Sequence, residues 1–509
     1  MKKSLISILG FAALLAACGN GATTNTSSTT GSGDQVKVIA SFYPMYDFTK
    51  NIVGDEGEVS LLIGSGVEAH GYEPSAKDMA IIQEADAFVY NNENMETWVP
   101  KLESTIDKDK VKMIKATEGM VLLPGSDEEE HDHDHSGEGH SHELDPHVWL
   151  APSLAIKEVE SIRDQLVTAF PAKKEAFEAN AKAYITKLTA LDETYKKELS
   201  VAKQKTFVTQ HAAFSYLALE YGLTQVPISG ISPDVEPSPS RLAELTTFVK
   251  ENDIKNIYFE ANASAKIAET LSKETGVQLL VLNPLESLTK EQMDKGEDYI
   301  SVMNENLAAL LKTTNTENNS PLAQTTKVTE KTIYNGYFED VDTQDRSLTD
   351  WAGEWQSVYP YLVDGTLDQV FDYKSKKDSS KTALEYKEYY TSGYKTDVDK
   401  ITITADTMEF FVNGQGHKAT YKYAGKHVLT YSKGNRGVRY LFEATEDVPG
   451  AYKYVQFSDH SIFPTKAGHF HIYFGNESQA ALLEELENWP TYYPANLNGL
   501  EIAQEMVAH

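Results

Sequence analysis

A polar segment at residues 313–327 separates two stretches of this chain that follow different hydrophobic patterns. It is rich in Thr, Asn and Ser, contains Pro321 and has almost no apolar residue, which is typical of a flexible linker. Before it, short β-branched runs alternate with helical patterns, whereas after it aromatic β-segments follow one another. Because 509 residues are too many for one core, we expect two domains, at 36–312 and 331–509, joined by a linker at 313–330.

Strand and helix patterns alternate in the first stretch, which favours α/β units on parallel sheets. Helical patterns occur, for example, at 75–84, 240–252 and 265–275. Four expected strands precede a long helical insertion at 152–202 and four follow it: 36–40, 59–63, 87–91, 111–115, 206–209, 225–228, 256–259 and 277–282.

The helical insertion at 152–202 is expected to join two lobes. Pro171 ends or kinks its first helix, and apolar residues from Phe177 to Tyr195 then recur at helical spacing. The second helix would run for roughly 40 Å at 1.5 Å per residue. So rigid a connection predicts that ligand capture involves loop rearrangement more than wide closure of the lobes.

Four metal-donor side chains follow strands of the first domain or border its insertion: His70, His147, His211 and Glu286. Ligands of open α/β sheets bind beyond the carboxyl ends of strands, so we expect these donors to converge on one crevice. A single histidine is more often structural, but the joint placement favours a metal site. Three imidazoles and one carboxylate suit tetrahedral Zn²⁺, whereas Mn²⁺ favours more oxygen ligands. Copper would bind such a set at least as tightly, so ligand identity does not decide selectivity.

A stretch of alternating acids and histidines lies just before His147, at residues 126–143. Five of the chain's 14 histidines fall within it: His131, His133, His135, His140 and His142. Imidazoles are competent to bind metal near pH 7, and the surrounding carboxylates raise the local cation concentration. With no apolar periodicity, the stretch is expected to be a mobile loop that assists metal capture. The alternative is a solvated acidic surface loop, which needs the acids but not the histidines.

Aromatic β-segments dominate the second stretch and suggest an antiparallel meander that closes into a small barrel. Turns are expected at 424–426 and 433–435, and helical patterns flank the meander at 348–359 and 479–487. The seven expected strands are 401–404, 408–412, 418–423, 427–432, 438–443, 452–457 and 470–474.

His460, His469 and His471 are the second metal signal. Because side chains alternate across a strand, His469 and His471 share one face and can hold a metal together. His460 lies one short loop upstream and completes three of four zinc positions, which leaves one for water or a mobile donor. The alternative is a pair of surface histidines on a strand. His417, His427 and His509 match no metal pattern and are expected to be structural.

The first residues predict export and anchoring. Lys2 and Lys3 precede an apolar run at 5–16, too short for a bilayer but typical of a signal peptide at 1–17. Leu15-Ala16-Ala17-Cys18 resembles a lipobox, which implies lipidation of Cys18 and a tether at 18–35 on the outer face of a membrane, as expected for a Gram-positive bacterium. Cys18 is the only cysteine, so metal sites must use nitrogen and oxygen. The net charge of −30 disfavours nucleic acid as a partner.

Several motifs of the first domain resemble metal-binding lipoproteins that supply ABC transporters. They include His70-Gly71-Tyr72-Glu73-Pro74, Asp145-Pro146-His147-Val148-Trp149-Leu150, Thr209-Gln210-His211-Ala212-Ala213-Phe214 and Asn283-Pro284-Leu285-Glu286-Ser287. The resemblance spans 36–312 and implies that His70, His147, His211 and Glu286 ligate Zn²⁺. Many relatives have an aspartate or water at the position of Glu286.

The second domain resembles the ZinT family of lipocalin-like zinc-binding proteins. Matching motifs include Tyr454-Val455-Gln456-Phe457-Ser458-Asp459-His460, His469-Phe470-His471-Ile472-Tyr473-Phe474-Gly475 and Asn488-Trp489-Pro490-Thr491-Tyr492-Tyr493-Pro494. By this resemblance His460, His469 and His471 are ligands. Together the two resemblances point to two-domain zinc lipoproteins of the AdcA type, and imply a monomer that captures Zn²⁺ and delivers it to an ABC permease.

Two other functional classes remain open at the level of sequence. A zinc hydrolase would use the open position of the three-histidine site, although no His-Glu-x-x-His helix and no Gly-x-Ser-x-Gly motif is present. A surface adhesin would use its metal structurally. A turnover screen separates the first class from a binding protein, and host-ligand binding by a metal-free variant would support the second.

Overall fold

The computed structural model describes residues 35–125, 144–233, 237–260, 266–317, 331–333, 335–431 and 433–508. The predictions for the signal peptide, Cys18, the tether, most of the linker, His509 and the five loop histidines lie outside these residues. No helix of the described part is both long and apolar enough to cross a membrane.

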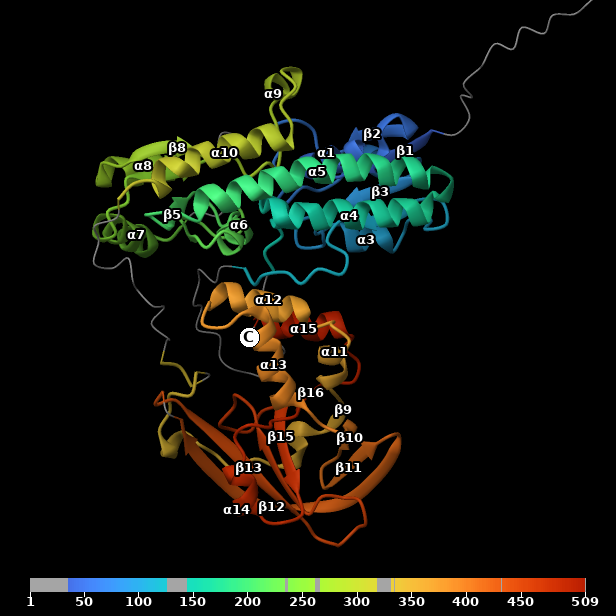
Figure 1. The fold of residues 1–509 in the computed structure, drawn as a ribbon, viewed down its shortest axis with the longest axis vertical. Coiled ribbons are helices and arrows are strands. Elements are labelled where there is room, and N and C mark those ends of the chain that lie inside the picture. The colour runs from blue at the N-terminus through green and yellow to red at the C-terminus, as the bar shows by residue number, and fades with distance from the viewer. Residues whose placement is uncertain are drawn as a thin grey trace, which may run out of the picture. The chain divides into compact units, whose positions relative to one another are not determined.

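Two four-stranded parallel sheets form the first domain, as expected (Figure 1). One has the order β2-β1-β3-β4, with β1 (Val36–Ala40), β2 (Gly57–Leu61), β3 (Ala87–Tyr90) and β4 (Lys112–Lys115). The other has the order β6-β5-β7-β8, with β5 (Thr206–Thr209), β6 (Thr224–Pro227), β7 (Asn256–Phe259) and β8 (Gln278–Val281). Each sheet reverses its order beside a central strand, and such a point places loops at the carboxyl ends together.

Helices connect the strands of both sheets. They are α1 (Tyr43–Val53), α2 (Ala76–Gln83), α3 (Val99–Glu103), α4 (Pro152–Ala169), α5 (Lys174–Leu199), α6 (Ser215–Glu220), α7 (Pro239–Glu251), α8 (Lys266–Thr275), α9 (Lys290–Asp294) and α10 (Tyr299–Thr314). Local sequence sets several of their starts. Ser75 and Asp78 form a capping box at α2, and Thr289 does the same with Gln292 at α9.

The long helix expected in the insertion is α5, which runs alongside α4 (Figure 1). Its 26 residues span about 39 Å. It packs against α1 from the first half and against α10 from the second. Tyr184 donates to Asp47 of α1 at 2.6 Å, and Tyr195 donates to the carbonyl oxygen of Met303 in α10 at 2.5 Å. Buried bonds from two positions along one helix therefore tie the two halves together.

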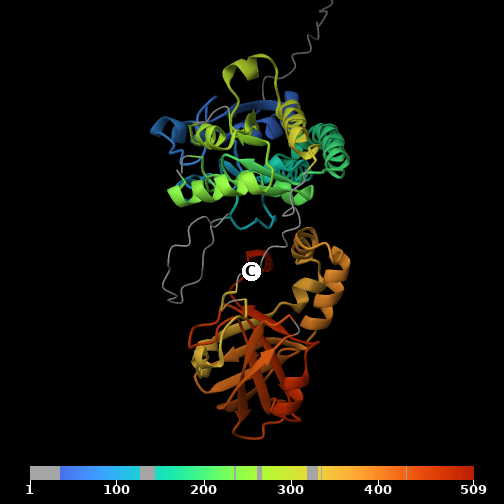
Figure 2. The ribbon, with the colours of Figure 1, turned by 90° about the vertical axis from the view of Figure 1, so that its left-hand side faces the viewer.

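The second domain is a closed antiparallel barrel with the order β10-β11-β12-β13-β14-β15-β16-β9. Its strands are β9 (Gly353–Ser357), β10 (Val398–Ile403), β11 (Thr407–Val412), β12 (Gln415–Thr430), β13 (Arg436–Ala444), β14 (Tyr454–Ser458), β15 (Phe470–Gly475) and β16 (Thr491–Pro494). Helices α11 (Tyr359–Val363), α12 (Asp368–Lys377), α13 (Ala383–Tyr394) and α15 (Gly499–Ala508) gather at one end of it (Figures 1 and 2), and α14 (Gln479–Glu484) packs on β14. The expectation of a small barrel is confirmed.

Three details of the predicted barrel are wrong. Residues 418–432 do not form a hairpin, because β12 continues through Gly425, whose φ of 108° accommodates a bulge in the pairing with β13. The helical pattern at 348–359 holds only a short 3-10 turn, Leu348–Trp351, before β9 begins. The sequence patterns also missed β9 and β16, which pair with each other and close the barrel.

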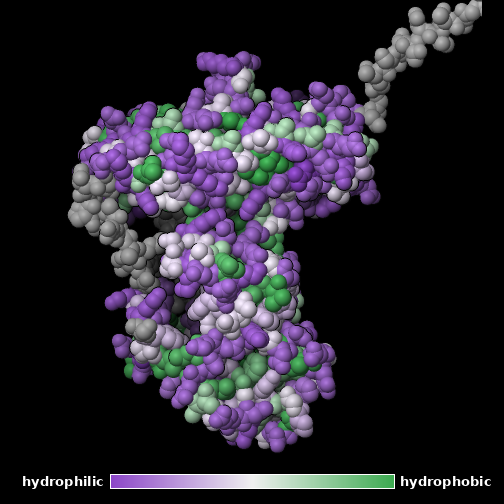
Figure 3. All heavy atoms as spheres, in the orientation of Figure 1, coloured by the Kyte–Doolittle hydropathy of each residue, from purple (hydrophilic) through white to green (hydrophobic). Residues whose placement is uncertain are grey.

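Aromatic side chains fill the barrel core. Trp351 stacks on Phe457 with ring centroids 4.7 Å apart, and Phe470 packs edge-on against Trp355 at the same separation. Phe470 and Ile472 point into this core, so the histidines on either side of Phe470 face away from it. The molecular surface differs from this core, because hydrophilic side chains cover most of the first-domain face drawn in Figure 3.

Candidate metal centres

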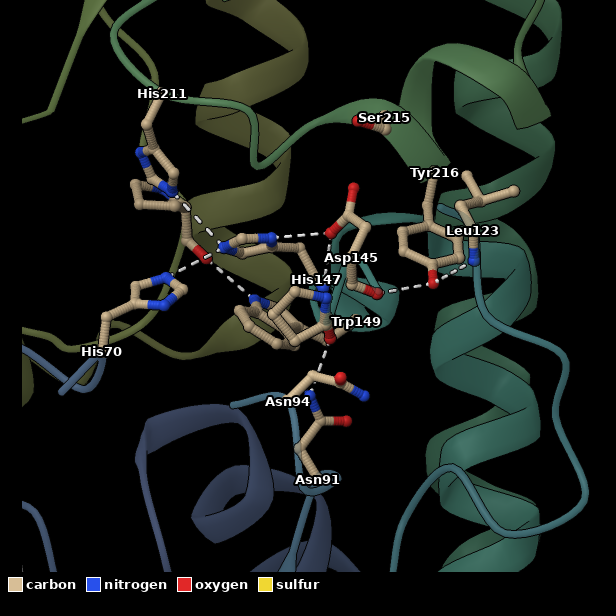
Figure 4. A network of polar contacts seen from close by, with 12 residues as sticks. His70, Asn91, Asn94, Leu123, Asp145, His147, Trp149, His211, Ser215 and Tyr216 are labelled. Carbon is tan, nitrogen blue, oxygen red and sulfur yellow. Dashed lines mark hydrogen bonds and ion pairs between the residues drawn. The ribbon is translucent and has the colours of Figure 1, made fainter. Parts of the chain in front are cut away.

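Four side chains from distant parts of the first domain meet at one point. His70 lies in the loop after β2, His147 precedes the turn Val148–Leu150, His211 follows β5 and Glu286 follows β8. Figure 4 shows the rings of His70, His147 and His211 pointing toward one another. His147 and His211 are fully buried, and Glu286 is 5% exposed. The structure thus brings together all four donors that the sequence placed after strands or beside the helical insertion.

The spacing of these donors matches the size of a tetrahedral zinc site. Nε2 of His147 lies 3.1 Å from Nε2 of His70 and 3.3 Å from that of His211. Oε1 of Glu286 lies 3.3–3.4 Å from all three nitrogens. A regular tetrahedron with edges of about 3.3 Å has its centre about 2.0 Å from each vertex, which is the usual Zn–N distance. One ion at that centre would contact four protein donors at once.

Two carboxylates hold the buried imidazoles in the required tautomer. Asp145 lies 2.7 Å from Nδ1 of His147. Glu260 forms a short hydrogen bond with Nδ1 of His211. In each case Nδ1–H donates to the carboxylate, and the lone pair of Nε2 faces the other ligands. Burial opposes protonation of both rings, but the adjacent carboxylates outweigh it and raise the pKa of His147 and, further, that of His211.

Sequence reasoning assigned no role to Asp145 or Glu260. A signal existed for each, since Asp145 is two residues before His147 and Glu260 directly follows β7. Glu260 therefore lies at the same kind of strand end as His211, which the sequence analysis did select.

A network of buried bonds supports the loop that carries His147 (Figure 4). Asn91 donates to the carbonyl oxygen of Pro146 at 2.7 Å, and Tyr216 donates to that of Asp145 at 2.7 Å. The indole of Trp149 donates to the carbonyl oxygen of Pro284 at 2.8 Å. This last bond links the loops of His147 and Glu286. The geometry of the centre therefore depends on contacts across both halves of the domain.

Glu286 is presented by a strained backbone. Leu285, which precedes it, is fully buried with a φ of 61°, a left-handed conformation that is uncommon for a residue with a side chain. Asn283 accepts a hydrogen bond from the Leu285 amide at 2.8 Å and stabilises the turn. Burial disfavours the ionised form of Glu286, but the three histidines outweigh it and hold its pKa well below the usual range. The carboxylate is therefore ionised and ready to bind a cation.

Glu68 is a second acid at this centre that the sequence did not single out. Its Oε1 accepts a hydrogen bond from the amide of His70 at 3.0 Å. Burial and the nearby charge of Glu286 raise the pKa of Glu68 to about 8. At neutral pH Glu68 is therefore mostly protonated, and Glu286 supplies the negative charge of the centre.

The second centre is formed by His460, His469 and His471 at the end of β14 and the start of β15. One ring nitrogen of each lies within 4.8 Å of the others. Nδ1 of His471 shares a hydrogen bond of 2.7 Å with the hydroxyl of Thr491. Burial lowers the pKa of His471 to about 3, so its ring stays neutral.

The described residues supply no carboxylate to this second group. The nearest acid in sequence, Asp459, is held by Arg346 at 2.7 and 2.9 Å and by the indole of Trp351 at 3.2 Å. Three neutral nitrogens therefore leave one tetrahedral position for a donor from elsewhere. Neither His417 nor His427 joins a metal-binding group within the described residues.

Comparisons with known proteins agree with this division of the chain. Residues 38–313 match the family model ZnuA, described as zinc-uptake complex component A, periplasmic. Residues 329–509 match ZinT, described as periplasmic lipocalin-like zinc-recruitment.

Curated relatives match the chain over almost its whole length. The zinc-binding lipoprotein AdcA of Streptococcus pneumoniae serotype 4 is 62% identical over 476 residues, which are 93% of this chain and 95% of that protein. The zinc-binding protein AdcA of Streptococcus pyogenes serotype M3 is 53% identical over 93% of this chain and 94% of its own length. The crystal structure of Zn(II)-bound AdcA from S. pneumoniae superposes with a TM-score of 0.84 at 61% identity, covering 93% of this chain and 100% of that one.

Proposed function

This chain belongs to the AdcA family of zinc-binding lipoproteins, and from that premise we propose that it captures Zn²⁺ outside the cell and delivers it to an ABC permease. The observation that carries the proposal is the cluster of His70, His147, His211 and Glu286, in which five of the six donor–donor distances are 3.1–3.4 Å. Its size suits zinc, and its four protein donors leave no position for an activated water. Such a site binds its ion reversibly and does no chemistry on it.

The two domains have different tasks in this proposal. The α/β domain, 36–312, is the delivery module that docks on the permease. The barrel domain, 331–509, binds a second Zn²⁺ through His460, His469 and His471 and widens the range of capture. Tethered donors raise the effective concentration of metal beside an acceptor to roughly the millimolar scale when the linker can span the distance. The histidines at 131–142 are proposed to assist in the same way.

Location follows from the first residues. We infer cleavage after residue 17, lipidation of Cys18 and a tether at 18–35 that holds a monomer on the outer face of the cell membrane. The linker at 313–330 then connects the two zinc-binding domains. Mass spectrometry of the membrane fraction tests the anchor, because a Cys18→Ser variant should lose the acyl mass and appear in the medium.

We also infer that the protein is not an enzyme. Among the described residues, a hydrolase could use the open position at the second centre. A screen of ester, phosphoester and peptide substrates against the zinc-loaded protein tests this inference, and turnover that disappears in His471→Ala would refute it.

Zinc uptake under limitation tests the main proposal. A strain with the intact chain should accumulate zinc at lower external concentrations than a strain whose chain ends at residue 320. A strain with His147→Ala and His211→Ala in the intact chain should fail to import. Equal uptake by the truncated and intact chains would remove the auxiliary role of the barrel, and uptake by the double variant would remove the delivery role of the first centre.

A further inference from the structure

The three histidines of the second centre lie in the wall of a cavity of about 500 Å³ within the barrel domain. A metal ion with one water fills little of this space, since a water molecule occupies about 30 Å³ in the liquid. Cavities of about 300–1,000 Å³ are the size in which proteins hold small organic molecules. The space beside the open coordination position therefore suits a ligand much larger than water.

Aromatic side chains line this cavity next to the histidines. The ring of Tyr493 stacks on His469, with centroids 5.0 Å apart and planes inclined by 13°. Tyr389 and Trp489 form a second aromatic pair in the wall, with centroids 5.2 Å apart, and Tyr389 is 50% exposed. Exposed aromatic faces around a polar centre are typical of sites that bind a flat or apolar body and orient it by a few polar groups.

One wall residue, Lys374 of α12, brings a positive charge that the described residues do not neutralise. No carboxylate of the described part pairs with its ammonium group, which lies 5.6 Å from the centroid of the Tyr390 ring. Burial and the nearby Lys377 lower its pKa, and no acid contributes in the opposite direction. The other charged wall residues are satisfied, because Arg436 pairs with Asp340 and Asp459 pairs with Arg346. An anionic group in the cavity would therefore find a partner in Lys374.

The charge of the bound metal also favours an anionic ligand in the cavity. Zn²⁺ on three neutral imidazoles keeps its full charge, whereas at the first centre Glu286 neutralises part of it. A donor that completes the second centre is therefore favoured if it belongs to an anion. Amino acids combine a nitrogen donor and a carboxylate in a molecule that fits a cavity of this size.

We propose that the barrel domain binds zinc together with an amino acid, which supplies the fourth donor to Zn²⁺ at His460, His469 and His471 and places its carboxylate against Lys374. The inference rests on the proposed function, because it requires zinc at the three-histidine centre. It assigns the two domains different forms of the same cargo. The barrel takes zinc that is already bound by extracellular amino acids, and the first centre takes the bare ion.

Equilibrium dialysis of the full chain with isotope-labelled L-histidine tests the proposal, with protein-bound zinc measured in the same samples. We expect the protein to retain histidine in the presence of Zn²⁺ and not in its absence, with the zinc still bound. Retention should disappear in His471→Ala. Loss of zinc from the protein on addition of histidine would show competition in place of a ternary complex and would overturn the proposal.

Recognition of the carboxylate is tested in two ways. Lys374→Met should weaken retention at least about tenfold, as expected for a lost charge-assisted contact, while Lys377→Met, an exposed lysine of the same helix outside the cavity, should change nothing. L-Histidine methyl ester, which lacks the carboxylate, should bind the unaltered protein as weakly as L-histidine binds Lys374→Met. This comparison needs no substitution, so a folding defect cannot obscure it.

The outcomes separate this inference from the proposed function. If calorimetry finds that Zn²⁺ alone does not bind the three-histidine centre, the proposed function fails for the barrel domain. If zinc binds but histidine is not retained, or if the ester is retained as well as histidine, only the proposal that an amino acid binds with the zinc is refuted.

Discussion

Oδ1 of Asp145 lies 2.7 Å from Nδ1 of His147, on the side of the ring opposite the metal-facing Nε2. The same carboxylate oxygen accepts a hydrogen bond from the His147 amide at 3.0 Å, so it holds both the backbone and the ring. Glu260 has the corresponding place behind His211. Both buried imidazoles are thus oriented before a metal arrives.

The contact between Asp145 and His147 leads to the first prediction. Asp145→Asn should lower the zinc affinity of the first centre by about 10–100-fold, because the ring loses its orienting partner but keeps its donor nitrogen. Competition against a zinc-binding dye measures the effect. Asp164→Asn, at an exposed position on α4, is the matched control. An unchanged affinity in Asp145→Asn would show that packing alone orients His147.

The two centres should lose metal independently. His211→Ala removes a donor of the first centre and should lower its zinc affinity by several orders of magnitude, because a tetrahedral ligand is lost. His471→Ala should do the same at the second centre. Calorimetry should show one equivalent lost in each variant and none lost in His417→Ala. Loss of both equivalents from one substitution would contradict independent sites.

Proton release should differ between the centres. Burial opposes protonation of His147 and His211, but the carboxylates beside them raise the pKa of both rings, so zinc competes with protons there. Burial lowers the pKa of His471 to about 3, so binding displaces no proton from that ring at neutral pH. The affinity of the first centre should therefore increase as pH rises and decrease as pH falls. Calorimetry in buffers with different ionisation enthalpies measures the number of protons released on zinc binding. If Asp145→Asn releases as many protons as the parent protein, the Asp145 carboxylate is not the cause of the raised pKa of His147.

Glu158 of α4 should limit stability at high pH. It is fully buried, neither carboxylate oxygen has a partner among the described residues, and burial raises its pKa well above the usual value. Because the folded protein holds this proton more tightly than the unfolded chain, its contribution to stability is present at low pH and is lost as pH rises through the folded pKa. Glu158→Gln should therefore stabilise the protein by about 1–3 kcal/mol at pH 8 and by less at pH 5.

Thermal unfolding at the two pH values measures this difference. Glu160→Gln, on the same helix and less buried, is the control and should have little effect at either pH. A gain in Glu158→Gln that does not depend on pH would show that the carboxyl group is not the cause.

Arg346 should be essential to the barrel. Its guanidinium has no exposure, bonds to Asp350 at 2.7 Å and to Asp459 at 2.7 Å, and lies 4.1 Å from the centroid of Trp351. Arg346→Met leaves the largely buried carboxylates of Asp350 and Asp459 without a cationic partner and should cost about 3–5 kcal/mol. Urea unfolding measures this, with the exposed ion-pair variant Arg163→Met as a control within about 1 kcal/mol of the parent. A small effect in Arg346→Met would mean that water replaces the guanidinium.

Local sequence patterns were sufficient for the fold of the first domain and for selecting the four side chains that meet at its candidate metal centre. The patterns at 36–40, 206–209 and 256–259 coincide with β1, β5 and β7, because a buried parallel strand needs an apolar run of its own. His70, His147, His211 and Glu286 could be named because strand ends of such sheets gather at one place.

The barrel was harder to predict from the sequence, because a sheet closes by pairing between strands that are far apart in the chain. Residues 353–357 lie within a helical pattern of the sequence, yet they become β9 by pairing with β10 on one side and β16 on the other. The local sequence around Gly425 predicts a turn, yet β12 pairs with β13 on both sides of it and accommodates Gly425 in a bulge.

The sequence by itself determined which atoms are available to bind a metal and which segments carry them, since these depend on residue type and on burial along one element. Only the tertiary structure decided that Glu260 stands behind His211, that Asp459 is bound by Arg346 and not by the second centre, and that Glu286 lies 3.3–3.4 Å from all three histidines of the first centre. Distances of this kind arise from packing between segments 49 or more residues apart, and no local periodicity records them.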